Sequence, residues 1–351
     1  MAASRAGIGL QAGLQGNSRA ACSPGMVGDA TCHASVQVRL RCRVFSAILS
    51  RFATLLHFVT MPLFITRLLL SLLPLLASLA SAATTPLPVA VSVLPQKYLV
   101  ERVGGSWVAV SSLVSGGKDP HTFEPTPAQV AQLAKAQLYF ATGMSFETGW
   151  LGKLQRSQST RVVDMRQGIK LRQQEAMLEL GHGHDDHEHG GSDPHVWTSP
   201  ANLRLIATTI ERELARSLPP TSHAELRQNK EALLRDIERS EQKIRALLAQ
   251  SAVRRFMVFH PSWGYFADAY GLQQLPIEYE GKEPGPRTLA QIIAIGKREQ
   301  IKVVFVQPQF SARAAGNIAG SLNARVEKLD DLAENVLLNL ESAAAAIAAS
   351  R

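Results

Sequence analysis

The chain has 351 residues, of which 46% are hydrophobic, a composition typical of a globular protein with room for two domains. Its formal net charge of +8 would suit nucleic acid or an anionic membrane surface, but residues 1–82 hold seven arginines and a single aspartate. The other 30 basic and 28 acidic residues, in 83–351, nearly balance. Neither kind of partner is therefore expected.

Residues 61–82 have the layout of a secretory signal peptide. In "MPLFITRLLLSLLPLLASLASAATT" a short basic segment ends at Arg67, and the apolar run that follows closes on the small residues ASA that a signal peptidase accepts. A membrane anchor is the alternative, but the run has only about 13 residues against the roughly 20 of a spanning helix, and Pro74 interrupts it. We predict cleavage after Ala82 and a periplasmic location.

Residues 1–60 precede that signal and have no place in an ordinary secretory leader, so we interpret them as a mis-called N-terminal extension. All three cysteines, Cys22, Cys32 and Cys42, lie in this extension. The chain after Ala82 has no cysteine for a disulfide, a thiolate metal ligand or lipid attachment. The expected product is a soluble periplasmic protein of a double-membraned bacterium.

From residue 88 onward, short β-rich runs alternate with helical segments, which predicts a parallel sheet flanked by helices. One predicted helix is "PTPAQVAQLAKA", with Thr126 as N-cap, Pro127 at the first helical position, and Val130, Leu133 and Ala134 on its apolar side. The predicted strands of this first unit are 89–94, 108–114, 137–142 and 161–165.

A second set of strands and helices follows later in the chain. Its predicted strands are "RFMVF", "LPIEY", "KVVFVQ" and "ARVEKL", separated by helices near "PSWGYFADAYG", "TLAQIIAIGKREQ" and "AAGNIAGSLN", with a last helix over 333–349. We therefore predict an α/β fold of two lobes, each with a parallel sheet flanked by helices.

Between the two units, residues 221–250 contain no glycine or proline and predict one long helix of about 45 Å. Charges fill one face and an apolar stripe the other; the stripe consists of Leu226, Leu233, Ile237, Ile244 and Leu248. A coiled-coil dimer is the alternative, but the repeat lasts only about four heptads. We favour a monomer in which a rigid helix joins an N-terminal lobe (83–220) to a C-terminal lobe (251–351).

Three isolated histidines are the strongest candidates for a binding site. His121 in "GGKDPHTFEPTP" and His195 in "SDPHVWTSP" both follow Asp-Pro and precede a Thr-Pro or Ser-Pro helix start. His260 directly follows the apolar strand "RFMVF", and ligands of parallel α/β sheets gather at the carboxyl ends of strands. Three imidazoles in such contexts predict a metal site.

The ligand types favour Zn²⁺. Three neutral imidazoles and one carboxylate suit this ion in a tetrahedral site, whereas Mn²⁺ prefers more oxygen and Cu²⁺ would also bind such a set. Asp330 in "EKLDDLAEN" is the predicted carboxylate, with Asp331 and Glu280 as rivals. Asp119 and Asp193 could orient the imidazoles or merely form Asp-Pro turns.

Six motifs occur in order along the chain: "DPHTFEPTP", "DPHVWTSP", "HPSWGYFADAYGL", "EGKEPGPRTLAQII", "VVFVQPQFS" and "KLDDLAENVLLNL". Together they resemble the zinc/manganese class of periplasmic solute-binding proteins of ABC transporters, most of all its zinc-uptake members, from about Pro88 to the C-terminus. The resemblance implies two α/β lobes joined by a long rigid helix, with metal bound between them.

The resemblance also implies the ligands. His121, His195 and His260 fall on the family's ligand positions, and Asp330 on its C-terminal aspartate. Gln307 in "VQPQF" stands where many relatives have glutamate, which puts a carboxylate contribution there in doubt. Manganese relatives tend to have glutamate in place of His260, so this histidine favours zinc.

The function implied is capture of Zn²⁺ and its delivery to an inner-membrane ABC permease with a cytoplasmic ATPase, without catalysis of any reaction. Because bound imidazoles must be deprotonated, affinity should fall as the pH drops through the histidine range at about 6.5. Two other classes stay open: a metallohydrolase that uses an activated water, and a surface adhesin or metal-buffering protein with no transport partner.

The segment 181–191 carries four further histidines, His182, His184, His187 and His189. The pattern His182-x-His184-x-Asp186-His187 also occurs in metallo-β-lactamase-like hydrolases, but there it should leave a strand and open a helix. Here the composition predicts a Gly/Asp/His-rich loop. Zinc relatives often carry a histidine-rich insertion at this place, so we favour an accessory, low-affinity metal loop; a polar loop without a role in uptake is the alternative.

Overall fold

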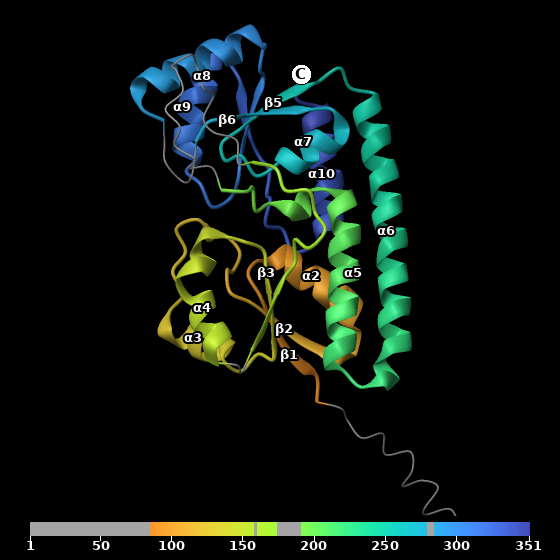
Figure 1. Ribbon diagram of the computed structural model, residues 1–351. Coiled ribbons are helices and arrows are strands. Elements are labelled where there is room, and N and C mark those ends of the chain that lie inside the picture. The colour runs from red at the N-terminus through yellow and green to blue at the C-terminus, as the bar shows by residue number, and fades with distance from the viewer. Residues whose placement is uncertain (1–84, 158–159, 174–190, 279–283) are drawn as a thin grey trace, which may run out of the picture. The chain divides into compact units, whose positions relative to one another are not determined.

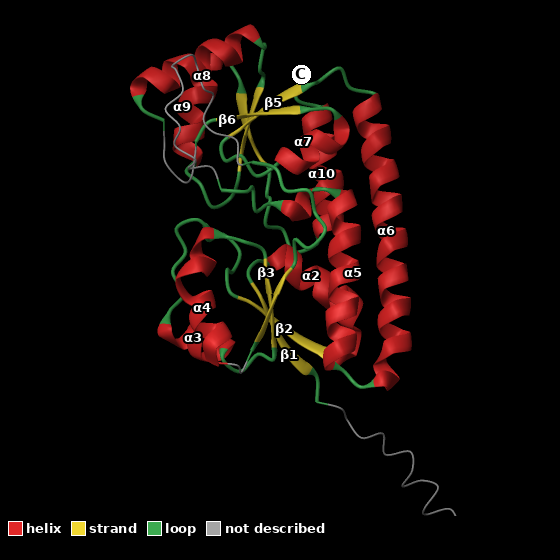
Figure 2. Cartoon of the chain, viewed as in Figure 1, coloured by secondary structure: helices red, strands yellow, loops and turns green. Residues whose placement is uncertain are grey.

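The computed structural model describes residues 85–157, 160–173, 191–278 and 284–351. In this part of the chain there are two four-stranded sheets, and all strand pairs within them are parallel (Figures 1 and 2). Helices flank both sheets. The predicted α/β fold of two lobes with parallel sheets is confirmed.

The N-terminal lobe is built from four strands with a helix in each crossover: β1 (Leu87–Val91), α2 (Leu94–Gly104), β2 (Val108–Ser112), α3 (Pro127–Leu133), β3 (Leu138–Ala141), α4 (Thr148–Ser157) and β4 (Arg161–Asp164). Two 3₁₀ turns, η1 (Gly105–Trp107) and η2 (Ser145–Glu147), complete it. The strand order is β2-β1-β3-β4. The two inner strands are almost completely buried, as expected for a parallel sheet that helices cover.

The C-terminal lobe repeats this plan with β5 (Arg255–Val258), α7 (Gly264–Tyr270), β6 (Gln273–Pro276), α8 (Pro286–Arg298), β7 (Val303–Val306), α9 (Ala312–Leu322) and β8 (Arg325–Lys328). Its strand order, β6-β5-β7-β8, is equivalent to that of the N-terminal lobe. In each sheet the first strand pairs with both the second and the third, so the winding direction reverses there. The carboxyl ends at such a reversal are where α/β proteins bind ligands.

Three further helices, α5 (Pro200–Ser217), α6 (His223–Ala249) and α10 (Val336–Ala348), lie beside the sheets, with two 3₁₀ turns, η3 (Val196–Thr198) and η4 (Pro220–Ser222). The long α6 packs against α5 and α2, which precede it in the chain, and against α10, which is the last helix. Its apolar stripe, from Leu226 to Leu248, is buried within the same chain. The stripe therefore does not form a coiled-coil seam with a second copy.

The two sheets share a hydrophobic core. One continuous cluster of buried side chains includes residues of β1 and β3, of α5 and α6, and Phe256 and Phe305 from β5 and β7. A separate cluster includes the alternate residues Met257 and Val304 of the same two strands, together with residues of α8 and α9. Successive side chains of a strand point to opposite faces, so the C-terminal sheet takes part in both clusters.

Most predicted strands agree with the observed ones within about two residues, and β6 begins earlier than the predicted "LPIEY". At α3 the predicted cap is confirmed: the Thr126 hydroxyl accepts a hydrogen bond from the backbone N–H of Gln129, and Pro127 is the first helical residue. The predicted apolar side of α3 was wrong. Leu133 is the only buried residue of this seven-residue helix, whereas Val130 and Ala134 are exposed, so the helix presents one apolar side chain to the core.

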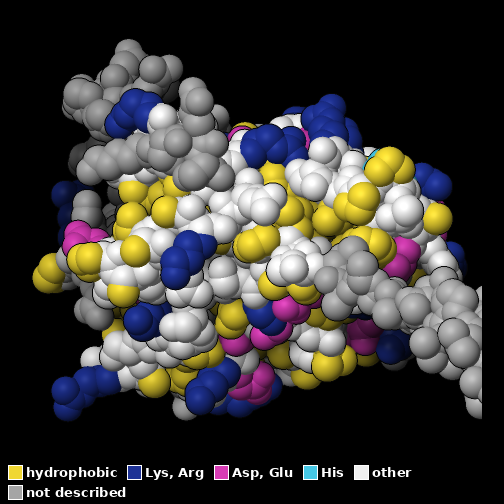
Figure 3. Space-filling model, turned by 90° about the horizontal axis from the view of Figure 1, so that it is seen from below, with side chains coloured by type: hydrophobic (Ala, Val, Ile, Leu, Met, Phe, Trp, Pro, Cys, Tyr) yellow, Lys and Arg dark blue, Asp and Glu magenta, His cyan; other side chains and the backbone are white. Residues whose placement is uncertain are grey.

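On the face drawn in Figure 3, Lys and Arg side chains are interspersed with Asp, Glu and hydrophobic ones. This mixture agrees with the near balance of charge in 83–351. Within the residues that the structure describes, no helix combines the length and hydropathy needed to cross a membrane.

Candidate metal centre

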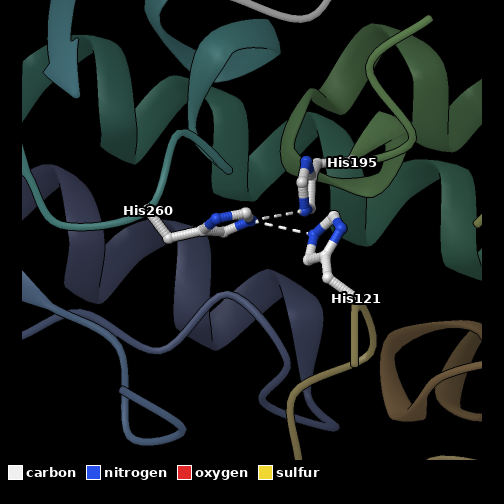
Figure 4. A group of neighbouring side chains, drawn as sticks. All are labelled: His121, His195 and His260. Carbon is white, nitrogen blue, oxygen red and sulfur yellow. Dashed lines mark hydrogen bonds between the residues drawn. The ribbon is translucent and has the colours of Figure 1, made fainter. Parts of the chain in front are cut away.

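Three imidazole rings from distant parts of the chain meet at one point (Figure 4). His121 lies in the loop after β2, His195 immediately before η3, and His260 two residues beyond the end of β5. One ligand nitrogen of each ring lies within 4.8 Å of the others. Nε2 of His260 is 3.1 Å from Nε2 of His121 and 3.2 Å from Nε2 of His195. The structure thus brings together the three histidines that the sequence singled out.

These separations are close to the edges of a zinc coordination tetrahedron. With Zn–N distances of about 2.0–2.1 Å and tetrahedral angles, two nitrogens on one ion lie about 3.3–3.4 Å apart. The observed 3.1 and 3.2 Å would therefore need only a slight expansion to admit the ion. All of the facing atoms are Nε2, which leaves the Nδ1 atoms free to bind protein groups.

Asp193 orients the ring of His195. Its Oδ1 accepts a hydrogen bond from the backbone N–H of His195 at 2.9 Å and one from ring Nδ1 at 2.8 Å. The second bond places a proton on Nδ1 and turns Nε2 toward the other two imidazoles. Both residues are buried, so this orientation is protected from water.

The other Asp-Pro-His motif uses its aspartate differently. Oδ1 of Asp119 accepts from the backbone N–H of His121 at 2.9 Å, and Oδ2 accepts from the Thr122 hydroxyl at 3.0 Å. Both bonds shape the turn that presents His121. Two roles were considered for these aspartates, orienting an imidazole and forming an Asp-Pro turn. Asp193 performs both, whereas the contacts of Asp119 define a turn.

His260 is held by residues that lie just past the ends of β6 and β7, the two strands beside β5. Its Nδ1 donates a hydrogen bond to Oε1 of Glu278. The amide of Gln307 donates to the backbone carbonyl of His260 at 2.7 Å and accepts from its backbone N–H at 3.2 Å. The ring of Phe310 stacks on the imidazole, with centroids 5.1 Å apart. The side chain of Gln307 thus positions His260 through its backbone.

Sequence reasoning missed the contacts of Glu278 and Gln307, and strand register explains both. In β5 and β6 partners are 18 positions apart, as in Val258 and Pro276. Extending that register by two residues places Glu278 beside His260. The β5–β7 register, 47 positions apart, places Gln307 beside His260 in the same way. The sequence does show a polar residue just past each of these strands, but it does not show the register in which the strands pair.

Burial and mutual repulsion decide which imidazole carries a proton. Burial lowers the pKa of His121 to about 3, and the charges of His260 and His195 act in the same direction. Burial also lowers the pKa of His260 well below its ordinary value, again with a contribution from His195. For His195 burial acts downward, but the hydrogen bond and charge of Asp193, with other carboxylates, outweigh it, so its pKa is raised. The site therefore holds a proton most readily on His195; in the protonated ring Nε2–H can donate to Nε2 of His260, 3.2 Å away.

Asp193 and Glu278 contact the Nδ1 side of their imidazoles, whereas the carboxylate of Asp331 lies near one of the facing Nε2 atoms. Its Oδ2 lies 4.0 Å from Nε2 of His195, and its Oδ1 accepts a hydrogen bond from Nε2 of Gln309 at 2.9 Å. The indole N–H of Trp197 donates to the backbone carbonyl of Asp331 at 2.7 Å and holds the loop against η3. Burial raises the pKa of the Asp331 carboxyl.

Asp330, the carboxylate predicted from the sequence, is used differently. Its Oδ1 accepts a hydrogen bond from the backbone N–H of Leu332 at 2.9 Å, and its backbone carbonyl accepts one from the side chain of Asn339. Both contacts shape the turn before α10. Of the two adjacent aspartates, the structure therefore brings Asp331 close to the imidazoles.

The other candidate residues lie outside the described part of the chain: Glu280, and the cluster of His182, His184, Asp186, His187 and His189. The described residues on either side of that cluster are close together, because Gln173 and Ser192 form an antiparallel bridge. Ser192 is three residues from His195. The described residues that border 174–190 thus lie beside the chain that leads to His195.

Comparison with known proteins shows which family shares these features. The family described as zinc-uptake complex component A, periplasmic (ZnuA), matches residues 89–342. The high-affinity zinc uptake system protein ZnuA of Yersinia pestis is 27% identical over 285 residues, which cover 76% of this chain and 87% of that protein.

Solved structures agree with this match. A crystal structure of ZnuA is 39% identical and has a TM-score of 0.69, with coverage of 76% of this chain and 99% of that one. The laminin-binding protein Lmb of Streptococcus agalactiae, described as bifunctional with adhesin and metal transporting activity, has a TM-score of 0.64 at 24% identity and covers 74% of this chain and 99% of its own. That second likeness shows the fold alone.

A two-lobe α/β fold with three converging imidazoles defines a metal-binding protein of the solute-binding type. The family match extends over residues 89–342, most of the chain, and the chain belongs to the ZnuA family of periplasmic zinc-uptake components. The resemblance drawn from the six motifs is confirmed, and with it the predicted class of function, the zinc-binding component of a zinc uptake system.

Proposed function

We propose that His121, His195 and His260 bind one Zn²⁺ through their Nε2 atoms and that Asp331 supplies the fourth ligand, in place of the Asp330 expected from the sequence. The observation that carries this proposal is the convergence of the three Nε2 atoms, with separations of 3.1 and 3.2 Å. Oδ2 of Asp331 is 4.0 Å from Nε2 of His195. The edge length of a zinc tetrahedron is about 3.3–3.4 Å, so the oxygen must approach this nitrogen by about 0.6–0.7 Å. It must also approach the other two imidazoles, because Asp331 lies outside the group whose ligand atoms are all within 4.8 Å of one another.

The donor set supports zinc over manganese. Three imidazole nitrogens and one carboxylate oxygen match the preference of Zn²⁺, whereas Mn²⁺ favours sites richer in oxygen. Gln307 supports the same choice, because its amide is engaged with the backbone of His260 and adds no carboxylate. Cu²⁺ would bind imidazoles as well, and we propose that metal supply rather than the site excludes it.

The biological role that we propose is capture of Zn²⁺ in the periplasm and its delivery to an ABC permease driven by a cytoplasmic ATPase. Membership of a family of transport components supports this role, in which the chain performs no covalent chemistry. We further propose export through the leader 61–82, cleavage after Ala82, and a monomeric product whose lobes, 83–220 and 251–351, are joined by 221–250. The histidines of segment 181–191 would serve as an accessory low-affinity store.

The proposal is tested by calorimetric titration of residues 83–351 with Zn²⁺ and Mn²⁺, with a competing chelator where binding is tight. His260→Ala should abolish the tight zinc site. His223→Ala is the matched control, since that imidazole contacts the backbone carbonyl of Ala215 away from the site and its loss should leave zinc binding unchanged. A deletion of 181–191 should keep the single tight site.

The two aspartates form a second matched pair. Asp331→Ala should weaken zinc binding strongly, while Asp330→Ala should affect it little. Tight binding that survives His260→Ala and disappears with the 181–191 deletion would overturn the proposed site. A deletion strain that grows normally under zinc starvation, with no other zinc importer present, would overturn the transport role and favour a buffering or adhesin protein instead.

A further inference from the structure

Arg172 lies where the chain approaches the metal centre from the N-terminal lobe. Its backbone carbonyl accepts a hydrogen bond from the backbone N–H of Asp193 at 2.9 Å, next to the bridge between Gln173 and Ser192. Two segments of the chain therefore run side by side here. One contains Arg172, and the other leads through Asp193 to His195.

The guanidinium of Arg172 connects this pair to helix α7 of the C-terminal lobe. Its Nη1 is 3.7 Å from Oδ2 of Asp193, and its Nε is 3.1 Å from Oδ2 of Asp268 in α7. Tyr265 completes the connection. Its hydroxyl accepts from the backbone N–H of Arg172 at 3.1 Å and donates to the backbone carbonyl of Asp193 at 2.9 Å.

Gly264, the first residue of α7, makes room for this guanidinium. A Cβ atom at position 264 would lie 1.3 Å from Nη1 of Arg172 and 2.5 Å from its Cζ. The arginine is thus pressed against the α7 backbone, and any side chain at position 264 must displace it. This close approach gives an independent way to move Arg172 without mutating it.

The two oxygens of Asp193 have different partners. Oδ1 binds the backbone and ring of His195, while Oδ2 faces Arg172. Only about 1% of Asp193 is exposed, so its negative charge is far from water and needs a nearby cation. If Arg172 were absent, the carboxylate would lose that cation and the contact that fixes its second oxygen.

We propose that Arg172 is a positioning residue for zinc binding: by holding Asp193 against α7, it fixes the imidazole of His195 in the orientation that the metal requires. This inference rests on the proposed function, because it assumes that His195 is a zinc ligand. It adds that the geometry of one ligand from the N-terminal lobe depends on Tyr265 and Asp268 of the C-terminal lobe.

The test is a double-mutant cycle on residues 83–351 with zinc affinity measured by chelator competition. Loss of a group that supports a metal ligand typically costs about 10- to 100-fold in metal affinity, so Arg172→Ala should weaken zinc binding by about tenfold. Gly264→Ala should weaken it to a similar extent because it displaces the same guanidinium. In the double variant the clash with the guanidinium no longer exists, and only the approach of the added Cβ to Oδ2 of Asp193, at 3.1 Å, remains. The loss should therefore stay close to that of Arg172→Ala alone and well below the product of the two single losses.

Two variants control for general effects. Arg102→Ala removes an arginine that pairs with Asp236 of α6, and Gly316→Ala adds a methyl group where nothing lies within 4 Å. Both should bind zinc like the wild type. At saturating Co²⁺, the visible absorption spectrum of Arg172→Ala should differ from that of the wild type, because the orientation of a ligand imidazole has changed; Arg172→Lys should move it back toward the wild type.

Three results would overturn the inference alone: wild-type zinc affinity in Arg172→Ala, losses that multiply in the double variant, or an unchanged Co²⁺ spectrum in a variant of reduced affinity, which would mean that Arg172 acts only on folding. Failure of the wild type itself to bind zinc tightly would overturn the proposed function and this inference with it.

Discussion

Lowering the pH from about 7.5 to about 5.5 should weaken zinc binding by roughly 10- to 100-fold, far less than three ordinary histidines would cause. An imidazole with a pKa of about 6.5 is about 10% protonated at the higher pH and about 90% at the lower, so each ordinary ligand would cost about tenfold and three would cost about 1,000-fold. Each titrating proton contributes at most a tenfold loss of zinc affinity per pH unit. The size of the loss therefore indicates how many ligands titrate in this range.

The structure reduces that count to one. Burial lowers the pKa of His121 to about 3 and that of His260 well below its ordinary value, so both rings stay neutral through this range and zinc displaces no proton from them. The pKa of His195 is raised, so its protonated form competes with zinc as the pH falls. One proton over two pH units gives the range of about 10- to 100-fold.

Chelator competition at several pH values measures the loss of affinity directly. Calorimetry in two buffers of different ionisation enthalpy counts the protons that zinc releases, and near pH 6 it should find about one. Release of two or more protons, or a loss near 1,000-fold, would refute the assignment of neutral rings to His121 and His260. An affinity that does not change with pH would refute the raised pKa of His195.

Three other predictions concern the groups around the site and the core. Glu278→Gln should weaken zinc binding by about tenfold, because the charge that polarises the Nδ1–H of a ligand imidazole is lost; chelator competition measures this. Leu233→Ala in α6 should lower the free energy of unfolding by about 2–5 kcal/mol, since the side chain is completely buried, whereas Leu338→Ala, at a side chain that is 60% exposed, should cost far less in the same urea titration. Gly296→Ala should destabilise the fold by about 1–3 kcal/mol, because a Cβ there would lie 2.7 Å from a side chain of α9; in thermal unfolding, an equal effect from Gly316→Ala would contradict this reasoning.

Much of the local structure follows from short-range chemistry that a sequence displays. The N-cap of α3 depends on Thr126 and Gln129, which are three residues apart. The turns that present His121 and His195 depend on an aspartate two residues before each histidine. Such bonds form within one turn of chain, so the residue types and their spacing were enough to predict them.

Contacts between distant segments depend on strand register and loop direction instead. Glu278 and Gln307 support His260 because β6 and β7 both pair with β5 in a particular register. From the sequence, Glu280 was a candidate for the carboxylate ligand, and it lies two positions after Glu278. Polar residues that follow a strand cannot be told apart until the register of that strand is known.

Patterns of neighbouring residues were enough to predict the two α/β units and to single out the three histidines, because strands and Asp-Pro-His turns are specified by residues close together in the chain. They could not decide between the adjacent residues Asp330 and Asp331. In the folded chain the indole of Trp197 holds the backbone of Asp331, and its carboxylate lies beside His195, while Asp330 closes a turn. Only the tertiary structure decides this, because Trp197 is 134 positions away from Asp331 in the chain.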